Sequence, residues 1–262
     1  MHAGTTLAQS EAPVASEVTP AYTLTGNVGV VSDYRFRGVS NTHRRPALQA
    51  GLEASHTASG LYGGIWGSNV ANAAFNGTQG YEFDAYGGWR TALNEQWQLD
   101  AGLATYWFPG AAISVAQPSG VNATVRYHTQ ELKLGLNSGS FNVTGWYSVG
   151  RYWSGFYRTD SLGNVRDVRG TRYLEVNWNP DLGNGVTLNL HVGTQRFRGL
   201  SAANFNDIRA GVTKAFGAEW QLSAAVIHND GDRAVWTFID PRDNSARYAA
   251  GTTLVLGVQR NF

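Results

Sequence analysis

The chain has 262 residues, a formal net charge of +1 and no cysteine, and its 32 glycines are joined by 9 tryptophans, 12 tyrosines and 11 phenylalanines. The missing cysteines exclude disulfides and thiolate metal sites, and the balanced charge gives no indication of nucleic-acid binding. Glycine and aromatic residues disfavour helix interiors, and no stretch approaches the roughly 18 apolar residues of a transmembrane helix. The composition therefore favours a twisted β-sheet.

From residue 22 onward the chain divides into segments of about 9 to 15 residues in which apolar and polar positions alternate, the pattern of β-strands. In 128–136, for example, Leu132 and Leu134 share one face, whereas Glu131 and Lys133 share the other. Twelve such segments are predicted, at residues 22–37, 46–57, 60–70, 80–92, 96–108, 127–137, 140–153, 171–179, 185–198, 205–216, 219–229 and 247–262. Each is long enough to cross a bilayer at the usual strand tilt, so a closed transmembrane barrel is predicted.

The connections between the segments alternate in length. Short ones lie near 59, 94, 138–139, 180–184 and 217–218, and mostly long ones lie at 38–45, 71–79, 109–126, 154–170, 199–204 and 230–246. Short periplasmic turns and long extracellular loops are typical of outer-membrane barrels. Both chain termini are therefore expected on the periplasmic side.

A soluble β-sandwich would also contain short alternating strands. The segments here are longer than the about 5–6 residues usual in soluble strands. Aromatic residues also gather at segment ends, which is typical of the girdles that flank a lipid-facing belt. These residues are Tyr22, Tyr34, Phe36, Trp97, Trp107, Phe108, Trp153, Trp178, Phe216 and Trp220. A membrane barrel is therefore favoured over the sandwich.

The N-terminal residues 1–20 are small and polar, and they predict a disordered segment ahead of a barrel over residues 21–262. A barrel of the outer membrane must be exported, but no apolar secretory segment follows Met1. We therefore expect that the leader has been trimmed or that the start has been misassigned.

An ordered set of motifs adds a family resemblance. The chain reads SDYRFRG at 32–38, PALQAGLE at 46–53, LYGGIWGSNV at 61–70, YEFDAYGGW at 81–89, TYWFPG at 105–110, GVTLNLHVG at 185–193 and GVTKAFG at 211–217. The set resembles the TorF-type porin family of Gram-negative bacteria over residues 22–262, most specifically in its SDYRFRG and GIWGSN blocks. This resemblance implies an outer-membrane barrel and a channel without a defined substrate. The loops 109–126 and 154–170 match nothing in that family.

The last segment ends in Phe262, with Val258 and Leu256 on the same face. This end resembles the C-terminal signal read by the barrel-insertion machinery, which is therefore an expected partner. Arg260 shares the outward face and is tolerated only near the interface, where its guanidinium reaches headgroups. Outer-membrane lipid and lipopolysaccharide are the other expected partners.

With the apolar faces assigned to lipid, the charged side chains must point into the lumen, since an Arg or Lys on the lipid face at mid-membrane costs about 2–4 kcal/mol. The predicted pore-lining residues are Asp33, Arg35, Arg37, Glu53, Glu82, Asp84, Arg90, Asp100, Glu131, Lys133, Glu175, Asp207 and Arg209. The first three are expected on the first strand, toward its outer end. In an open lumen these charges select among small polar solutes, whereas in a filled lumen they form a salt-bridged plug. Twelve strands fall between the about eight of filled barrels and the about sixteen of open channels, so both interpretations remain.

Alternation also sets two local registers. Phe216 and Trp220 both face lipid, so a three-residue turn at 217–219 should join their strands. A three-residue turn at 93–95 should set Arg90 opposite Gln98 and within salt-bridge reach of Asp100.

No enzyme, cofactor or metal is predicted. The histidines have no paired spacing, and neither a G-x-S-x-G nor an HExxH motif occurs. Asp230 and Asp232 in NDGDR could bind Ca²⁺ or lipopolysaccharide, but they lack the bidentate Glu of a calcium loop, and a solvated turn is the simpler interpretation.

We predict an all-β protein, a transmembrane antiparallel barrel of about twelve strands in the bacterial outer membrane. Its expected function is passive diffusion of small hydrophilic solutes or ions through a narrow lumen. The alternative is a non-conducting structural or surface-recognition barrel that acts through its loops at 109–126, 154–170 and 230–246. The solute, the ion selectivity and the oligomeric state do not follow from the sequence.

Overall fold

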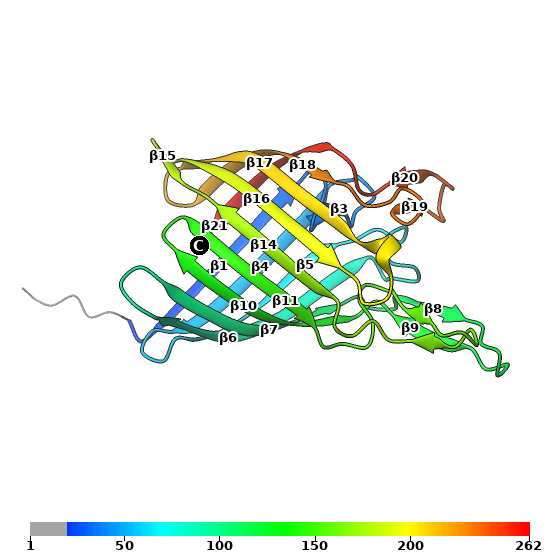
Figure 1. Ribbon diagram of the computed structural model, residues 1–262. Coiled ribbons are helices and arrows are strands. Elements are labelled where there is room, and N and C mark those ends of the chain that lie inside the picture. The colour runs from blue at the N-terminus through cyan, green and yellow to red at the C-terminus, as the bar shows by residue number, and fades with distance from the viewer. Residues whose placement is uncertain (1–19) are drawn as a thin grey trace, which may run out of the picture.

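The computed structural model describes residues 20–262, in which one antiparallel sheet closes into a barrel (Figure 1). Twelve strands form the wall: β1 (Tyr22–Val31), β4 (Ala47–His56), β5 (Leu61–Asn69), β6 (Tyr81–Ala92), β7 (Gln98–Trp107), β10 (Thr129–Ser138), β11 (Phe141–Ser148), β14 (Arg172–Trp178), β16 (Val186–Arg196), β17 (Phe205–Phe216), β18 (Trp220–Asn229) and β21 (Thr253–Asn261). Strand β1 pairs with both β4 and β21, and β14 pairs with β16, which closes the ring. The short strand β15 (Asp181–Gly183) extends β16. The predicted twelve-strand barrel is confirmed, whereas residues 1–19 of the predicted disordered segment lie outside the described residues.

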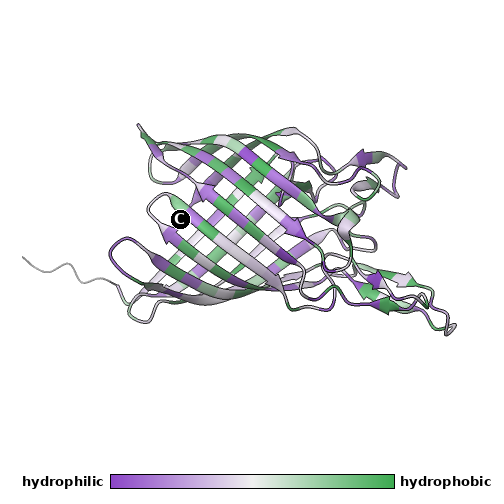
Figure 2. Cartoon of the chain, in the orientation of Figure 1, coloured by the Kyte–Doolittle hydropathy of each residue, from purple (hydrophilic) through white to green (hydrophobic). Residues whose placement is uncertain are grey.

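Side chains along the wall strands alternate between the outside and the lumen. In β10, Leu132, Leu134 and Leu136 are exposed on the outside, whereas Glu131 is fully buried. Figure 2 shows hydrophobic and hydrophilic residues alternating along the strands around the barrel. An apolar belt of this extent requires lipid around it, because such a surface in water would drive aggregation.

Exposed aromatic side chains border this belt at both ends. Near the short turns they are Tyr22, Trp89, Phe141, Trp178, Phe216, Trp220 and Phe262. Near the long loops they are Tyr81, Phe83, Trp107 and Tyr147. These two bands have the arrangement of interfacial girdles.

Three wall strands are shorter than predicted by five or six residues at the long-loop end. Strand β1 ends at residue 31 rather than 37, β11 ends at 148 rather than 153, and β21 begins at 253 rather than 247. The residues beyond these ends leave the wall and pack into buried clusters formed by the outer loops. The girdle prediction was therefore wrong for Tyr34, Phe36, Phe108 and Trp153, which belong to these clusters.

The connections have the predicted distribution, with short turns at one end of the barrel and long loops at the other (Figure 1). The long loops carry four small hairpins: β2 (Arg35–Phe36) with β3 (Val39–Ser40), β8 (Ala112–Val115) with β9 (Ala123–Arg126), β12 (Arg158–Thr159) with β13 (Val165–Arg166), and β19 (Thr237–Ile239) with β20 (Ala246–Tyr248). A 3₁₀ turn, η1 (Ser201–Ala203), precedes β17. Among residues 20–262, no helix is long and apolar enough to span a membrane.

The two predicted registers have different outcomes. Phe216 pairs directly with Trp220 across a three-residue turn, as predicted. Arg90 pairs directly with Asp100, so the predicted register there was wrong by two residues. The turn is longer because the side-chain oxygen of Asn94 accepts hydrogen bonds from the backbone N–H groups of residues 96 and 97. A shift of two residues keeps every side chain on its face, so the two charges still meet in the lumen.

Candidate functional site: the barrel lumen

The loop after β1, residues 32–46, folds into the barrel and crosses the lumen. At its tip, Arg37 donates hydrogen bonds to Glu131 of β10 at 2.6 and 3.0 Å and to Gln195 of β16 at 2.8 Å. In the ring of strands, β10 and β16 lie on the side of the barrel opposite β1. The N–H of Ser40 also donates to the carbonyl of Ala249 at 2.9 Å. The loop therefore occupies the outer part of the lumen.

The local sequence explains how Arg37 reaches this position. Arg37 and Gly38 have φ angles of +49° and +75°, as the two central residues of a type I′ hairpin turn require. Glycine adopts this conformation freely, but arginine does so only under constraint. The constraint comes from Glu131 and from the ring of Tyr173, whose centroid lies 4.2 Å from the guanidinium.

Asp33, Arg35 and Arg37 are therefore not on the first strand, and that prediction was wrong. The alternation in SDYRFRG belongs to the small β2–β3 hairpin, which has the same period as a wall strand. Asp33 pairs with Arg35 at 2.7 Å and accepts hydrogen bonds from the hydroxyls of Ser40 and Thr42. Burial lowers the pKa of Arg35, an effect that the neighbouring Asp33 opposes.

A second charged group lies on β4, β6, β7 and β10. Arg90 pairs with Glu53 at 2.7 Å and with Asp100 at 3.3 Å, and Lys133 pairs with the same Asp100 at 2.6 Å. The hydroxyl of Tyr62 donates to Asp100 at 2.6 Å, and its ring lies 3.7 Å from the Arg90 guanidinium. Four of the predicted pore-lining residues thus form one network of mutually balanced charges.

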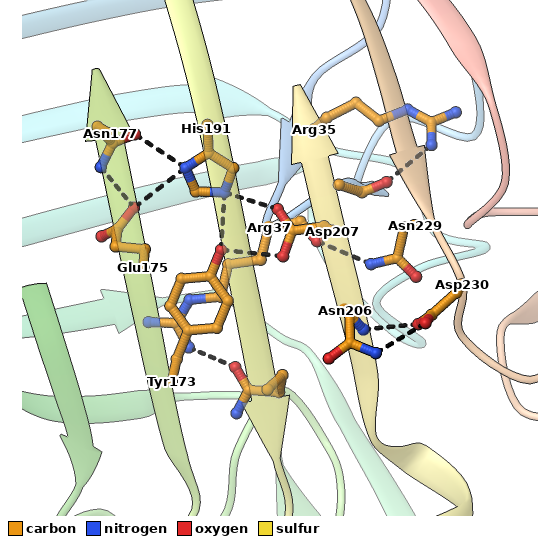
Figure 3. A network of polar contacts seen from close by, with 12 residues as sticks. Arg35, Arg37, Tyr173, Glu175, Asn177, His191, Asn206, Asp207, Asn229 and Asp230 are labelled. Carbon is orange, nitrogen blue, oxygen red and sulfur yellow. Dashed lines mark hydrogen bonds and ion pairs between the residues drawn. The ribbon is translucent and has the colours of Figure 1, made fainter. Parts of the chain in front are cut away.

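A third network joins β14, β16 and β17 (Figure 3). His191 lies 2.9 Å from Asp207 and 3.6 Å from Glu175, and the hydroxyl of Tyr173 donates to Asp207 at 2.9 Å. Glycine at position 193 leaves the necessary room, because a Cβ there would overlap the Tyr173 hydroxyl. Neither His191 nor Tyr173 was predicted as a site residue, although alternation along β14 and β16 places both on the inward face.

Three predicted residues have a different environment. Glu82 and Asp84 follow one another on the inward face of β6, and each has a buried oxygen without a hydrogen-bond partner among residues 20–262. Neither forms an ion pair with a described Arg or Lys. Arg209 shares the inward face of β17 with Asp207. Its side chain is exposed, and it likewise forms no ion pair within the described chain. The unbalanced lumen charges are therefore mainly acidic.

Two cavities lie inside the barrel, and Tyr106 lines both of them. The outer one, of about 170 Å³, is lined by Glu82 and aromatic side chains of the loops. The inner one, of about 230 Å³, is lined by Asp84, Arg90 and Lys133. Charged walls of this kind can discriminate between solutes by charge and by hydrogen bonding. Among the described residues, no group of three or more His, Cys, Asp or Glu side chains could hold a metal ion.

Comparison with known proteins extends this description. A family model described as "Bacterial protein of unknown function (Gcw_chp)" matches residues 15–262. No curated protein matches the chain. Among solved structures, the KdgM porin has a TM-score of 0.51 at 8% identity, covering 91% of this chain and 99% of its own.

Two further structures have similar scores. The KdgM porin in complex with disordered oligogalacturonate has a TM-score of 0.51 at 7% identity, covering 91% of this chain and 98% of its own. The NanC porin in a rhombohedral crystal form has a TM-score of 0.52 at 12% identity, covering 91% of this chain and 99% of its own. At these identities the similarity concerns the barrel fold.

Proposed function

We propose that this chain, which belongs to the Gcw_chp family of bacterial proteins of unknown function, is an outer-membrane channel for passive diffusion of small hydrophilic solutes or ions. The observation that carries the proposal is a closed barrel with an apolar outside and a charged lumen, in which the wall strands and the in-folded loop 32–46 together present eight acidic and five basic side chains. The blocks at 32–38 and 61–70 support its placement among the TorF-type porins.

The C-terminal strand supports the outer-membrane location. Phe262 is 66% exposed, and Leu256 and Val258 face outward on the same strand. We propose that this end is read by the barrel-insertion machinery. Arg260 faces outward near the short turns and pairs with Glu219 at 2.8 Å, which reduces the cost of placing it at the membrane interface.

The charges of the lumen favour cations. Four of the five basic side chains are paired with carboxylates, whereas Glu82 and Asp84 have no cationic partner among the described residues. The KdgM structure named above contains oligogalacturonate, a carboxylate-bearing ligand. The acidic excess here argues against ligands of that charge, so we propose small cations and neutral polar solutes.

A non-conducting barrel is the second candidate, and one observation favours it. The tip of the loop 32–46 is fixed by the Arg37–Glu131 ion pair, and aromatic clusters around Phe36 and Trp153 fill the outer end. In this arrangement the long outer loops would carry the function by binding a partner at the cell surface.

Recording from purified protein in planar bilayers distinguishes the two. Under a gradient between about 0.01 and 0.1 M salt, we expect a reversal potential of cation-selective sign, since surface charges act over longer distances at low salt. An anion-selective potential would refute the cation preference. If neither the native chain nor an Arg37→Ala variant with a freed loop conducts, the channel proposal is wrong and the surface-recognition barrel is favoured.

A further inference from the structure

The outer cavity has an unusual lining for a polar lumen. It lies between the loop 32–46 and the segments after β5, β11 and β18, and nine of its seventeen lining residues are aromatic. Phe36, Tyr106, Trp153 and Trp236 are among them, and Glu82 is the only charged residue of the set. A single carboxylate thus faces a wall made mostly of aromatic rings.

Two buried polar atoms at this cavity have no partner among residues 20–262. Glu82 is 1% exposed and its Oε2 accepts no hydrogen bond, and Trp236 is 3% exposed and its Nε1 donates none. Buried polar atoms are nearly always hydrogen-bonded, and an uncompensated buried carboxylate is especially costly. Both residues line the cavity, so its lining includes one acceptor and one donor without a partner among residues 20–262, which indicates a site for a polar ligand.

We propose that this cavity binds a small organic cation, such as a quaternary ammonium or a protonated amine. The carboxylate of Glu82 balances the charge of the ligand, and the rings of Tyr106 and Trp153 contact its alkyl groups through cation–π attraction. The indole N–H of Trp236 donates to an oxygen of the ligand. A hydrated inorganic cation fits less well, because an aromatic wall cannot replace its water ligands.

The neighbouring charges permit such a ligand. The guanidinium of Arg37 lies 4.8 Å from the ring centroid of Phe36, but its charge is balanced by Glu131 at 2.6 Å. Asp84, two residues further along β6, lines the inner cavity rather than this one and adds negative potential. The site requires the in-folded loop, and it does not require that the barrel conducts.

The test measures binding of choline to the detergent-solubilised full chain by calorimetry. The comparison ligand is dimethylbutanol, the neutral isostere in which carbon replaces the nitrogen. We expect choline to bind and the neutral isostere to bind at least about tenfold more weakly, as expected for a buried cation–π site with a carboxylate. Equal binding of the two ligands, or no binding of choline, would overturn the proposal without use of any variant.

Two substitutions on the same strand face provide the matched control. Glu82→Gln keeps the shape and removes the charge, so choline binding should weaken at least about tenfold. Asp84→Asn makes the same change two residues away. Because Asp84 adds negative potential without lining this cavity, choline binding should weaken there, but clearly less than in Glu82→Gln. Equal effects of the two variants would mean that the cation responds to the overall lumen charge and not to this site.

Trp236→Phe removes the indole N–H donor but keeps an aromatic ring at this position. Choline carries a hydroxyl and should bind this variant more weakly, whereas tetramethylammonium, which has none, should be unaffected. Loss of both ligands alike would show that Trp236 only shapes the cavity and would refute its assigned role. Binding without conductance would refute the channel proposal alone, and conductance without binding would refute this one alone.

Discussion

The guanidinium of Arg37 and the carboxylate of Glu131 form a bidentate ion pair across the lumen, with Nη2–Oε2 and Nη1–Oε1 distances of 2.6 and 3.0 Å. Their side chains are 5% and 0% exposed. The indole of Trp153 adds a hydrogen bond to Glu131 at 3.0 Å, and Gln195 accepts one from Arg37. This pair fixes the loop 32–46 to the opposite wall of the barrel.

Arg37→Gln should release that loop. The substitution leaves Glu131 buried without a counter-charge, and removing one partner of a buried pair costs roughly 3–5 kcal/mol. The loop can avoid this cost by leaving the lumen, so we expect faster amide hydrogen exchange over residues 32–46. The double variant Arg37→Gln/Glu131→Gln removes both charges and should recover most of the lost protection. A single variant as well protected as the native chain would contradict the assigned role of the pair.

Gly193→Ala should destabilise the barrel through the third network. A Cβ at this position would overlap the hydroxyl of Tyr173 and lie 2.8 Å from Oδ1 of Asp207. Overpacking of this kind costs about 1–3 kcal/mol, which urea unfolding in detergent would detect as a lower midpoint. Gly145→Ala is the control, because the nearest atom to its Cβ would be the Leu134 carbonyl oxygen at 3.9 Å. We expect no loss there, and equal losses in both variants would point to a general intolerance of alanine.

The wall of the barrel was predictable because its strands obey a simple rule. Lipid outside and polar groups inside impose a two-residue period, and Phe216 and Trp220 could be placed opposite one another from parity alone. The same rule placed Arg90 and Asp100 on one face even though their register was wrong. The two-residue period determines which face of the sheet a side chain occupies, but the length of the turn determines which residue lies opposite it. The turn between β6 and β7 is longer than predicted because Asn94 accepts hydrogen bonds within it.

The outer end was not predictable by the same rule. SDYRFRG alternates like a wall strand, but its hairpin packs inside the lumen, where both faces meet protein. Aromatic residues such as Tyr34 and Trp153 are equally compatible with a lipid interface and with a protein core, so composition could not distinguish the two. The contact between His191 and Asp207 depends on the pairing of β16 with β17, which no local sequence pattern encodes.

The orientation of the barrel can be tested on intact cells. The chain has no cysteine, so a cysteine introduced at Leu162 in the β12–β13 loop or at Leu182 in β15 would be the only thiol. Both side chains are well exposed, at 72% and 58%. A membrane-impermeant thiol reagent should label Leu162→Cys on intact cells and Leu182→Cys only after the outer membrane is disrupted. The opposite labelling pattern would mean that the long loops face the periplasm and that the proposed orientation is wrong.

The hairpin of β19 and β20 should loosen in acid. Asp240, whose side chain is 0% exposed, pairs with Arg242 and with Arg45, both at 2.7 Å. Hydrogen bonds from Arg242, and then from Arg45, hold the pKa of the Asp240 carboxyl below its usual range. A carboxyl with a lowered pKa in the folded state stabilises the fold fully above its unfolded pKa of about 3.9, and this contribution is lost as the pH falls further.

Hydrogen exchange over residues 237–248, expressed relative to an unstructured peptide at each pH, would measure this loss. Protection should stay constant from about pH 7 to 5 and decline below about pH 4. Asp240→Asn cannot lose a charge, so its protection should be lower near neutrality and should change less as the pH falls. Asp243 also has a lowered pKa, through hydrogen bonds from Ser245, so a small residual decline is expected in that variant. A native hairpin that keeps its full protection down to about pH 2 would show that the Arg242 and Arg45 pairs with Asp240 do not hold it in place.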